Sequence, residues 1–294
     1  MSVDLACGDL AFVDLTFPAL DGLPGLGEER HAADFVRSPG GAAITAIGAA
    51  RLGLSVALAS PIGADADGDF LRERLAAEGV RWVGRTVART AVTVVLPVDG
   101  DRAMATYDPG EHVTADDLAA VAPRAAILSL PRLGAAPAGA RVYAVTGDAE
   151  ARAGLPALDG VHALLINERE SRLLSGIDDP AAAARALGEH VGRVVVTLGP
   201  RGALEWSGGE LVTVAGIPVE VVDTTGAGDL FAAAYIRADL AGASVQERLE
   251  WAVLYASMSV GVPTAVAGAA TLEELVEAGA RRGLVWVPIE EEAR

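Results

Sequence analysis

The sequence predicts an α/β protein in which helices cover a mainly parallel central sheet and a small β-subdomain interrupts the first half. Short apolar runs recur along the chain, separated by stretches long enough for helices, and such runs are typical of parallel strands buried on both faces. Residues 11–38 and 81–107 depart from this rhythm because they favour hairpins. The 294 residues, 51% of them hydrophobic, are enough for one large core, and we expect a single domain over residues 1–294.

The strands of the main sheet are expected where apolar residues run together, and the helices where helix formers lie between these runs. The first strand ends at Gly8. In the small β-subdomain, a strand over 89–98 turns at Asp99-Gly100 and returns over 102–107. The other strands are expected over residues 3–8, 55–62, 125–130, 141–145, 163–166, 194–198 and 219–222, and helices over 42–52, 69–77 and 230–236.

The stretch 251–272 carries no charged residue and is long enough to span a membrane. It is, however, rich in Ala, Ser, Gly and Thr, contains Pro263, and is flanked by Glu250 and Glu273 instead of basic residues. We therefore expect a buried helix, a loop and the start of a packed helix. With Cys7 as the single cysteine and no basic N-terminal segment of a signal peptide, a cytoplasmic protein that does not bind membranes is expected.

The charged residues exclude several classes of function. The formal net charge is −17, which repels a phosphate backbone, so we expect no nucleic-acid partner. The chain has no lysine, and all 23 of its cationic Lys or Arg residues are arginines. Walker-A NTPases, protein kinases and enzymes that form a Schiff base all need a lysine. The four histidines have no metal-ligand spacing, so a zinc site is not expected.

The strongest chemical signal is the segment 223–229, with the sequence DTTGAGD, which precedes a run of helix formers. Its small residues let a ligand approach the backbone, and N–H groups at a helix N-terminus attract anions. Asp229 lies in the first turn, where a carboxylate would repel a bound phosphate but could act as a base toward an attacking hydroxyl. The alternative is an ordinary capped helix after a tight turn.

Five segments together resemble the PfkB (ribokinase-like) family of carbohydrate and nucleoside kinases. The segment 223–236 matches the second signature of that family at every defined position. The segment that begins at Gly40-Gly41 is similar to the first signature, except that Ile44 stands where the family usually has Asn. The patterns at 63–68, 167–170 (N-x-x-E) and 197–202 (T-L-G-x-x-G) also resemble family motifs. The five occur in the family's order, and the resemblance covers essentially the whole chain.

The resemblance implies a three-layer α/β/α ribokinase-like fold with a small β-lid formed by residues 11–38 and 81–107. It implies an ATP-dependent kinase that phosphorylates a hydroxymethyl group of a sugar or nucleoside. Asp229 would be the catalytic base, and Gly226, Ala227 and Gly228 would form an anion hole for the transferred phosphoryl group. The lid would close over the acceptor and could hold a second subunit, which implies a homodimer.

The same resemblance implies the nucleotide and metal sites. Glu170 would order the shell of Mg²⁺, and Asn167 would lie near the phosphates. Asp223 and Thr225 match positions that supply oxygens to a monovalent cation, K⁺, in many members. The nucleotide pocket would be lined by Thr197, Gly199 and Gly202. The residues themselves leave alternatives open: an Asn that caps the following helix, a solvated helical Glu, and turn chemistry at 223–225.

The acceptor side departs most from the family pattern. The family usually has an Asp five residues after the glycine that ends the first strand, but this position is Val13, and the acid is Asp14. A shift of one residue points a side chain to the other face of a strand, so Asp14 reaches the acceptor only if the strand is irregular. Gly40 and Gly41 would let the acceptor approach the backbone, or would serve only helix packing.

The Ile44 substitution would expose an apolar surface in the same region, which favours an acceptor less polar than a simple hexose, such as a nucleoside or a modified sugar. A different class of function remains open, in which the chain is a catalytically weak relative that binds a nucleotide or a sugar as a sensor. Asp229 argues against that class, whereas Val13 and Ile44 argue for it.

Overall fold

The computed structural model describes residues 2–18, 20, 22–98 and 101–289. Its centre is a nine-stranded sheet with the order β15-β14-β13-β12-β11-β10-β1-β4-β6. The strands from β13 to β6 in this order are parallel, whereas β14 pairs antiparallel with both β13 and β15. The strands are β1 (Ser2–Gly8), β4 (Val56–Leu58), β6 (Arg81–Trp82), β10 (Ala122–Ser129), β11 (Arg141–Val145), β12 (Val161–Asn167), β13 (Arg193–Thr197), β14 (Ala203–Ser207) and β15 (Glu210–Val214).

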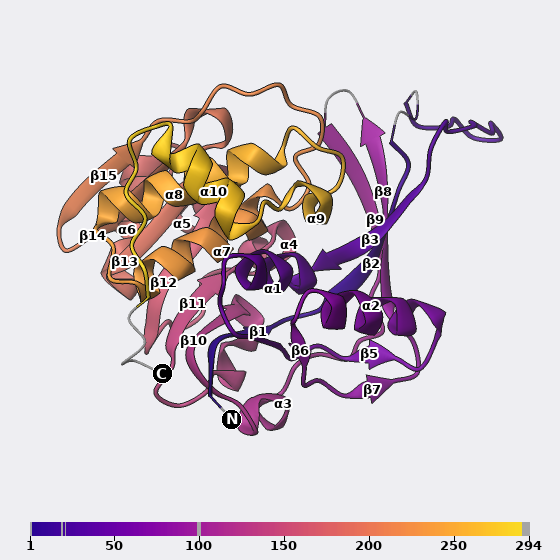
Figure 1. Ribbon diagram of the computed structural model, residues 1–294, viewed down its shortest axis with the longest axis horizontal. Helices are drawn as coiled ribbons and strands as arrows, with labels where there is room; N and C mark the ends of the chain where they lie inside the picture. Colours follow the sequence, from indigo (N-terminus) through magenta and orange to yellow (C-terminus); the bar gives the residue numbers. More distant parts are fainter. Residues whose placement is uncertain (1, 19, 21, 99–100, 290–294) are drawn as a thin grey trace.

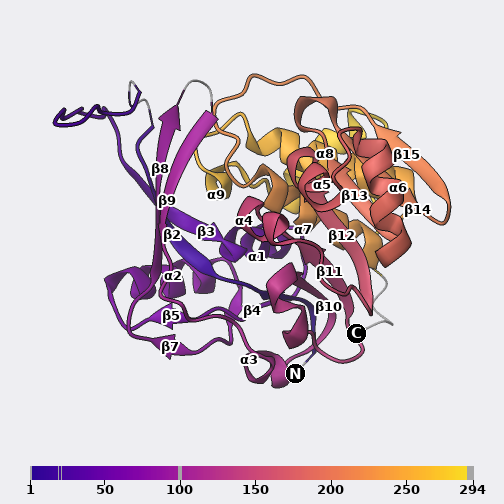
Figure 2. The same cartoon turned by 180° about the vertical axis from the view of Figure 1, so that it is seen from behind.

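Helices cover both faces of this sheet, which confirms the predicted three-layer α/β fold. Helices α1, α7, α8 and α10 lie on the face seen in Figure 1, and α4, α5 and α6 lie on the face seen in Figure 2. The largest hydrophobic cluster fills the space between the sheet and α1, α7 and α8. The helices are α1 (Ala42–Arg51), α2 (Ala66–Ala77), α3 (Ala115–Ala119), α4 (Asp148–Ala153), α5 (Glu168–Ser175), α6 (Pro180–Val191), α7 (Ala227–Leu240), α8 (Val245–Ser259), α9 (Ala265–Gly268) and α10 (Leu272–Ala280).

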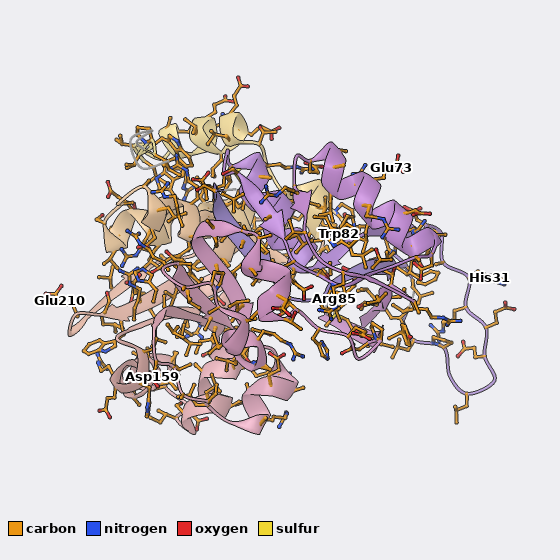
Figure 3. The ribbon with its side chains drawn as sticks, turned by 90° about the horizontal axis from the view of Figure 1, so that it is seen from below. His31, Glu73, Trp82, Arg85, Asp159 and Glu210 are labelled. Atoms are coloured by element: carbon orange, nitrogen blue, oxygen red, sulfur yellow. The ribbon has the colours of Figure 1, made fainter. Side chains whose placement is uncertain are left out.

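A second, four-stranded sheet lies at one end of the molecule, with the order β3-β2-β8-β9. It consists of β2 (Ala11–Thr16), β3 (Val36–Gly41), β8 (Ala91–Val98) and β9 (Asp101–Tyr107). We call it the small sheet. The loop between β2 and β3 projects away from the rest of the chain and carries His31, whereas Glu210 lies at the opposite end of the molecule (Figure 3). The hairpin turn expected at Asp99-Gly100 lies outside the described residues.

The boundaries of the small sheet differ from those expected. Its second half begins at Ala91, because residues 81–82 form β6 at the edge of the main sheet and Thr86–Val87 (β7) pairs with Ile62–Gly63 (β5). The indole N–H of Trp82 donates to the Ser60 carbonyl at 2.8 Å, which ties this segment to the main sheet. The expectation that residues 81–90 belong to the small sheet was therefore wrong.

Two predicted strands are also corrected. The strand expected over 55–62 is broken into β4 and β5, with Pro61 between them. The strand expected over 219–222 is absent from the described structure. The N–H groups of Val222 and Asp223 both donate to one acceptor, the Val260 carbonyl, so no ladder of strand pairs forms. Val221 and Val222 are 58% and 56% exposed, so this apolar run does not enter the core.

The uncharged stretch 251–272 forms the end of α8, the short α9 and the start of α10, as expected. Trp251 and Tyr255 are buried in the main core, and the Tyr255 hydroxyl donates to the Ala270 carbonyl at 3.0 Å. Among the described residues, no helix has the length and apolar character needed to cross a membrane.

A buried ion pair fastens α8 to the main sheet. Glu205 on β14 is fully buried and accepts hydrogen bonds from the Arg248 guanidinium, with Nε at 2.9 Å, and from the Tyr235 hydroxyl at 2.7 Å. Arg248 is itself only 5% exposed. Removing one partner of such a pair leaves a buried charge without compensation, which is more costly than replacing both partners.

We therefore expect Glu205→Ala to lower the free energy of unfolding by about 3 kcal/mol or more, measured by urea denaturation. The matched control is Glu277→Ala, which removes an exposed partner of Arg281 on α10 and should change stability by no more than about 0.5 kcal/mol. Equal effects of the two substitutions would show that the buried pair does not hold α8 in place.

Candidate active site

The N-terminus of α7 forms the centre of the candidate site. Gly226 precedes the helix in the left-handed conformation, with φ 72° and ψ 4°. A Cβ at this position would lie 2.3 Å from the Ala265 Cβ and 3.0 Å from the Ile44 Cδ1, so only glycine fits. The first N–H groups of a helix lack intrahelical acceptors, and a Cβ added at Gly228 would meet nothing within 4 Å. This turn can therefore present backbone donors to an anion in open space.

Asp229 lies in the same turn and is oriented by a neighbouring helix. The Thr45 hydroxyl on α1 donates to the Asp229 carboxylate at 3.0 Å, and Thr45 is buried. Burial, together with the nearby charge of Asp229, raises the pKa of the Cys7 thiol on β1. Asp229 therefore lies beside the carboxyl end of β1. The sequence motifs do not point to Thr45, because only the packing of α1 against α7 brings this residue to Asp229.

Ile44 does not expose an apolar surface, so that expectation was wrong. It is 3% exposed and belongs to the main hydrophobic core. Its side chain packs against Gly226, at 3.0 Å and 3.1 Å from the position of an added Cβ. The side chain thus supports the turn before α7 from below, and an apolar residue suits this buried position.

Asp14 and Gly40 meet on one face of the small sheet. In the register of β2 and β3, Phe12 faces Gly40 and Asp14 faces Ser38, so Asp14 is diagonal to Gly40. A Cβ at Gly40 would lie 2.2–2.3 Å from the Asp14 carboxyl group, so this carboxyl lies directly over the glycine backbone. Val13 points to the other face and is fully buried in the core.

The chain places Asp14 on this face because β1 and β2 are not one continuous strand. β1 ends at Gly8 and β2 begins at Ala11, with a bend between them where the Leu10 N–H donates to the Asp9 carboxylate at 2.7 Å. Counting residues from Gly8 therefore does not preserve the alternation of faces. The irregularity that Asp14 needed is this break before β2 and not a bulge within it.

Polar side chains outside the predicted site residues continue this face. Thr93 on β8 is in register with Asp14, and Thr106 on β9 is in register with Thr93. The hydroxyls of Thr93 and Thr106 are 3.0 Å apart, and Ser38, Asp14 and Thr93 are all buried. A row of oxygen atoms therefore crosses the small sheet next to Gly40, where hydroxyl groups of a ligand could find partners.

Asp223 holds together the loop before α7. One of its oxygens accepts from the Thr225 N–H at 2.8 Å and the other from the Thr264 N–H at 3.0 Å. Thr264 has φ 66°, and it is the only non-glycine residue of the described chain with a positive φ. The Thr225 hydroxyl is buried without a hydrogen-bond partner among the described residues. The turn chemistry is thus real, and the orphaned hydroxyl oxygen could be a ligand for a cation.

Asn167 and Glu170 form a capping box at the start of α5. The Asn167 side chain accepts from the Glu170 N–H at 2.8 Å, and the Glu170 carboxylate accepts from the Asn167 N–H at 2.8 Å. Asn167 thus caps the helix, but Glu170 is not a solvated residue, because it is 8% exposed. Burial, and then the charges of Asp148 and Glu150, raise the pKa of Glu170 to about 7.

This cluster of acids would suit a cation. A bound Mg²⁺ would favour the ionised form of Glu170, which is disfavoured without it. No group of three or more His, Cys, Asp or Glu side chains in the described part of the chain is arranged to hold a metal directly. The residues therefore fit an ion that is bound mainly through its own waters, as Mg²⁺ commonly is.

The segment 197–202 is the turn between β13 and β14. Thr197 ends β13 and lies in register with Asn167, so these two of the four candidate nucleotide residues are neighbours. Gly199 and Gly202 have φ 58° and 98°, and a Cβ at Gly202 would lie 2.0 Å from the Val214 carbonyl. Both glycines are thus required by the turn.

The structure brings the candidate residues to the carboxyl ends of the parallel strands, as in many α/β proteins that bind ligands. Asn167 and Thr197 end β12 and β13, and Asp229 lies beside the end of β1. Gly41 precedes α1 with φ 58°, and a Cβ there would lie 2.5 Å from the Leu10 carbonyl and 2.4 Å from the Phe12 ring, so only glycine fits where the start of α1 meets β2.

The raised pKa of Glu170 makes a prediction for stability. Because its pKa in the folded chain is about 7 and the ordinary value is 4.5, the unfolded chain ionises first as the pH rises. The wild type should lose up to about 3 kcal/mol between pH 4.5 and 7.5 relative to Glu170→Gln, which keeps the capping box. Urea unfolding at pH 5 and pH 8 measures this, with Glu189→Gln at an exposed position on α6 as control. A difference that does not change with pH would contradict the assignment.

Comparisons with known sequences identify relatives over parts of the chain. A deoxyribokinase from Salmonella typhi is 35% identical over 100 residues, which are 32% of this chain and 33% of that protein. A ribokinase from Bacillus subtilis is 33% identical over 120 residues, which are 41% of this chain and 40% of that protein. These matches span between a third and two fifths of the relatives' own lengths.

Solved structures match almost the whole chain. The ribokinase of Arabidopsis thaliana, solved with ribose and ATP, is 26% identical with a TM-score of 0.80, covering 95% of this chain and 99% of that one. A candidate ribokinase II from E. coli, solved with ATP and Mg²⁺, has a TM-score of 0.77 at 24% identity, over 96% and 100% of the two chains. The latter likeness shows the fold. The model of the pfkB family carbohydrate kinases matches residues 1–130 and 135–272. The chain therefore belongs to the PfkB family, whose members are phosphotransferases that act on hydroxyl groups of sugars or nucleosides.

Proposed function

We propose that this protein is an ATP-dependent kinase that transfers the γ-phosphate to a hydroxymethyl group of a sugar or nucleoside. The observation that carries the proposal is the position of the Asp229 carboxylate. It lies in the turn of α7 that presents backbone donors to an anion, and the Thr45 hydroxyl on α1 holds it there. A site that only bound a phosphate would gain nothing from a carboxylate there, because like charges repel. A base for the attacking hydroxyl explains the arrangement. The same observation speaks against a sensor without catalysis.

In the proposed reaction, α7 supplies the base and the backbone donors, and α1 orients the base. Asp229 accepts the proton of the acceptor hydroxyl as its oxygen attacks the γ-phosphorus of ATP in line with the leaving ADP. The N–H groups of Gly228 and its neighbours, at the positive end of α7, stabilise the negative charge on the transferred phosphoryl group. The Thr45 hydroxyl keeps the Asp229 carboxylate in place. These backbone donors explain how the chain could act on ATP without a lysine.

Glu170 would hold the water shell of Mg²⁺, which, when bound, neutralises charge on the phosphates of ATP. Asn167, Thr197, Gly199 and Gly202 lie at adjacent strand ends, where they would border the nucleotide. The buried, unpartnered Thr225 hydroxyl supports K⁺ as a further ligand. Comparison of turnover in potassium and tetramethylammonium buffers tests whether K⁺ takes part.

A polar acceptor is favoured over the less polar one that the sequence suggested. The less polar acceptor was expected because Ile44 would expose an apolar surface, but Ile44 is buried. Asp14 lies over Gly40 in a row of hydroxyl and carboxylate oxygens, which suits an acceptor with several hydroxyl groups. The names of two relatives, a deoxyribokinase and a ribokinase, support this class, whereas the name of a third, a cytidine kinase, points to a nucleoside.

The small sheet would act as the lid of the site. The face of this sheet that carries Gly40 and Asp14 would cover the acceptor and exclude water. ATP would therefore be hydrolysed only slowly in the absence of an acceptor. The edge strand β9 of the small sheet exposes Met104 and Tyr107, at 59% and 47%, which supports a homodimer through this sheet. Analytical ultracentrifugation would measure the oligomeric state.

The single, buried cysteine, which is free, supports a cytoplasmic location.

Loss of the base should abolish the reaction. With Mg²⁺-ATP and K⁺, we expect ADP release that depends on a sugar or nucleoside, measured over ribose, 2-deoxyribose, fructose and cytidine. Asp229→Ala should lower this turnover at least about 100-fold. Asp69→Ala, at a side chain 81% exposed on α2, is the control and should leave it unchanged. Acceptor-dependent turnover that survives in Asp229→Ala would refute the proposed base.

Asp14 should govern acceptor binding more than the chemical step. Asp14→Asn weakens charge-assisted hydrogen bonds to acceptor hydroxyls, so we expect KM for the acceptor to rise about 10-fold or more while KM for ATP stays unchanged. Gly40→Ala should have a similar effect, because its Cβ would displace the Asp14 carboxyl group. If both variants kept the wild-type KM for the acceptor, Asp14 would have no part in binding it.

A further inference from the structure

A cavity of about 470 Å³ lies at the end of the main sheet where the parallel strands begin. Arg124, Arg141 and Arg193 line it, and they stand at or near the starts of β10, β11 and β13, whereas the candidate active site lies where the parallel strands end. The C-terminal end of α7 closes the cavity. Since α7 has 14 residues, its two ends are about 20 Å apart. The N-terminus, where β1 begins, marks this end of the sheet in Figure 1.

The lining of this cavity is cationic in a strongly acidic protein. Four of the chain's 23 arginines and His162 face it, against one acidic lining residue, Asp239. We call it the arginine cavity. In a chain with a net charge of −17, such a concentration of positive charge in one hollow is unusual. It creates a local attraction for anions that the rest of the surface lacks.

The residues at the floor of the arginine cavity form a hydrogen-bonded network around Asp239. Asp239 accepts from the Tyr143 hydroxyl and from Arg193 Nη1 at 2.7 Å, and it lies 2.9 Å from His162 Nε2. Burial would raise the pKa of Asp239, but hydrogen bonds from His162 and Tyr143 and the Arg193 charge hold it well below its ordinary value. The Asp239 carboxylate is therefore ionised and satisfied, and Arg248 is engaged by Glu205. The floor holds its shape without a ligand.

The two arginines at the rim are much less engaged. The Arg141 side chain is 49% exposed, and only its Nη1 has contacts within the described structure, at 3.3 Å from the Asp239 carbonyl and 3.7 Å from the Asp239 carboxylate. Arg124 reaches the Asp4 carboxylate at 3.3 Å and the Leu240 carbonyl at 3.4 Å. These bonds are long for charged donors, and both guanidinium groups keep further N–H groups for an acceptor.

The tips of the two rim arginines lie side by side, because they contact the adjacent carbonyls of Asp239 and Leu240. Two neighbouring guanidinium groups over a fixed floor match the geometry of a phosphate group, which accepts several charge-assisted hydrogen bonds at once. If the arginines only capped the end of α7, short bonds and a filled space would be expected instead of a cavity large enough for a small metabolite.

We propose that the arginine cavity binds a phosphate group, carried by inorganic phosphate or by a phosphate monoester. Arg141 and Arg124 donate to the phosphate oxygens, and Arg193 and Arg248 supply positive charge from the floor. The site is separate from the proposed kinase site, and it does not depend on that proposal.

Residue-by-residue modification of arginines by phenylglyoxal, followed by mass spectrometry, tests the site without any kinase assay. Inorganic phosphate, at constant ionic strength, should slow the modification of Arg141 at least fivefold in a saturable manner. Arg281 follows the end of α10, is 65% exposed and does not line the cavity, so it should react at an unchanged rate. Equal slowing of both residues, or no saturable protection of Arg141, would overturn the proposal.

Calorimetric titration distinguishes the two sources of the phosphate group. Inorganic phosphate and ribose 5-phosphate are titrated into the wild type, Arg141→Gln and the matched control Arg281→Gln. For each ligand that binds in the arginine cavity, Arg141→Gln should raise the dissociation constant at least 10-fold, because one charged donor is lost. Binding at the candidate active site would persist in all three proteins. Identical isotherms for the three proteins with both ligands would refute the phosphate site.

Discussion

The close packing of α1 against α7 is the contact on which the candidate site depends. A Cβ at Gly48 on α1 would lie 2.5 Å from the Leu230 Cδ2 on α7, so even an alanine there would displace the Leu230 side chain. The approach of the two helices brings the Thr45 hydroxyl to the Asp229 carboxylate at 3.0 Å. It also presses Ile44 under Gly226, whose left-handed conformation begins α7. One helix contact thus places the base, its orienting hydroxyl and the backbone donors together.

Helix α7 also joins two very different environments. Its first turn faces open space with backbone donors, whereas its last turn lies among buried ion pairs of Asp239, Arg193 and Arg248. Charges are costly to bury, and they are tolerated here because each has hydrogen-bonded partners on the sheet and on α8. The network fixes the far end of the helix, and this in turn fixes the direction in which the first turn points. The absence of lysine from the sequence suits the network, because planar guanidinium groups pair with two carboxylate oxygens at once.

Several features of the site could be predicted from the sequence for clear physical reasons. The motif 223–229 contains the residues that its geometry demands, since Gly226 is the only type that fits its φ and its close neighbours. The parallel strands could be placed because they are apolar on both faces. The strand predicted over 219–222 was wrong because β-branched residues favour a strand only where a partner strand is available, and there is none beside this exposed segment.

The sequence by itself determined the family, the α/β class and the positions of the motifs, because these depend on residue type and on short-range spacing. Only the tertiary structure decided that Asp14 and not Val13 lies on the Gly40 face, since a bend between β1 and β2 resets the alternation. It alone revealed that Ile44 is buried under Gly226 and that Thr45 reaches Asp229. It also gathered four arginines, from three strands and one helix, around one cavity. These features arise from contacts between residues far apart in the chain, which spacing along the sequence does not encode.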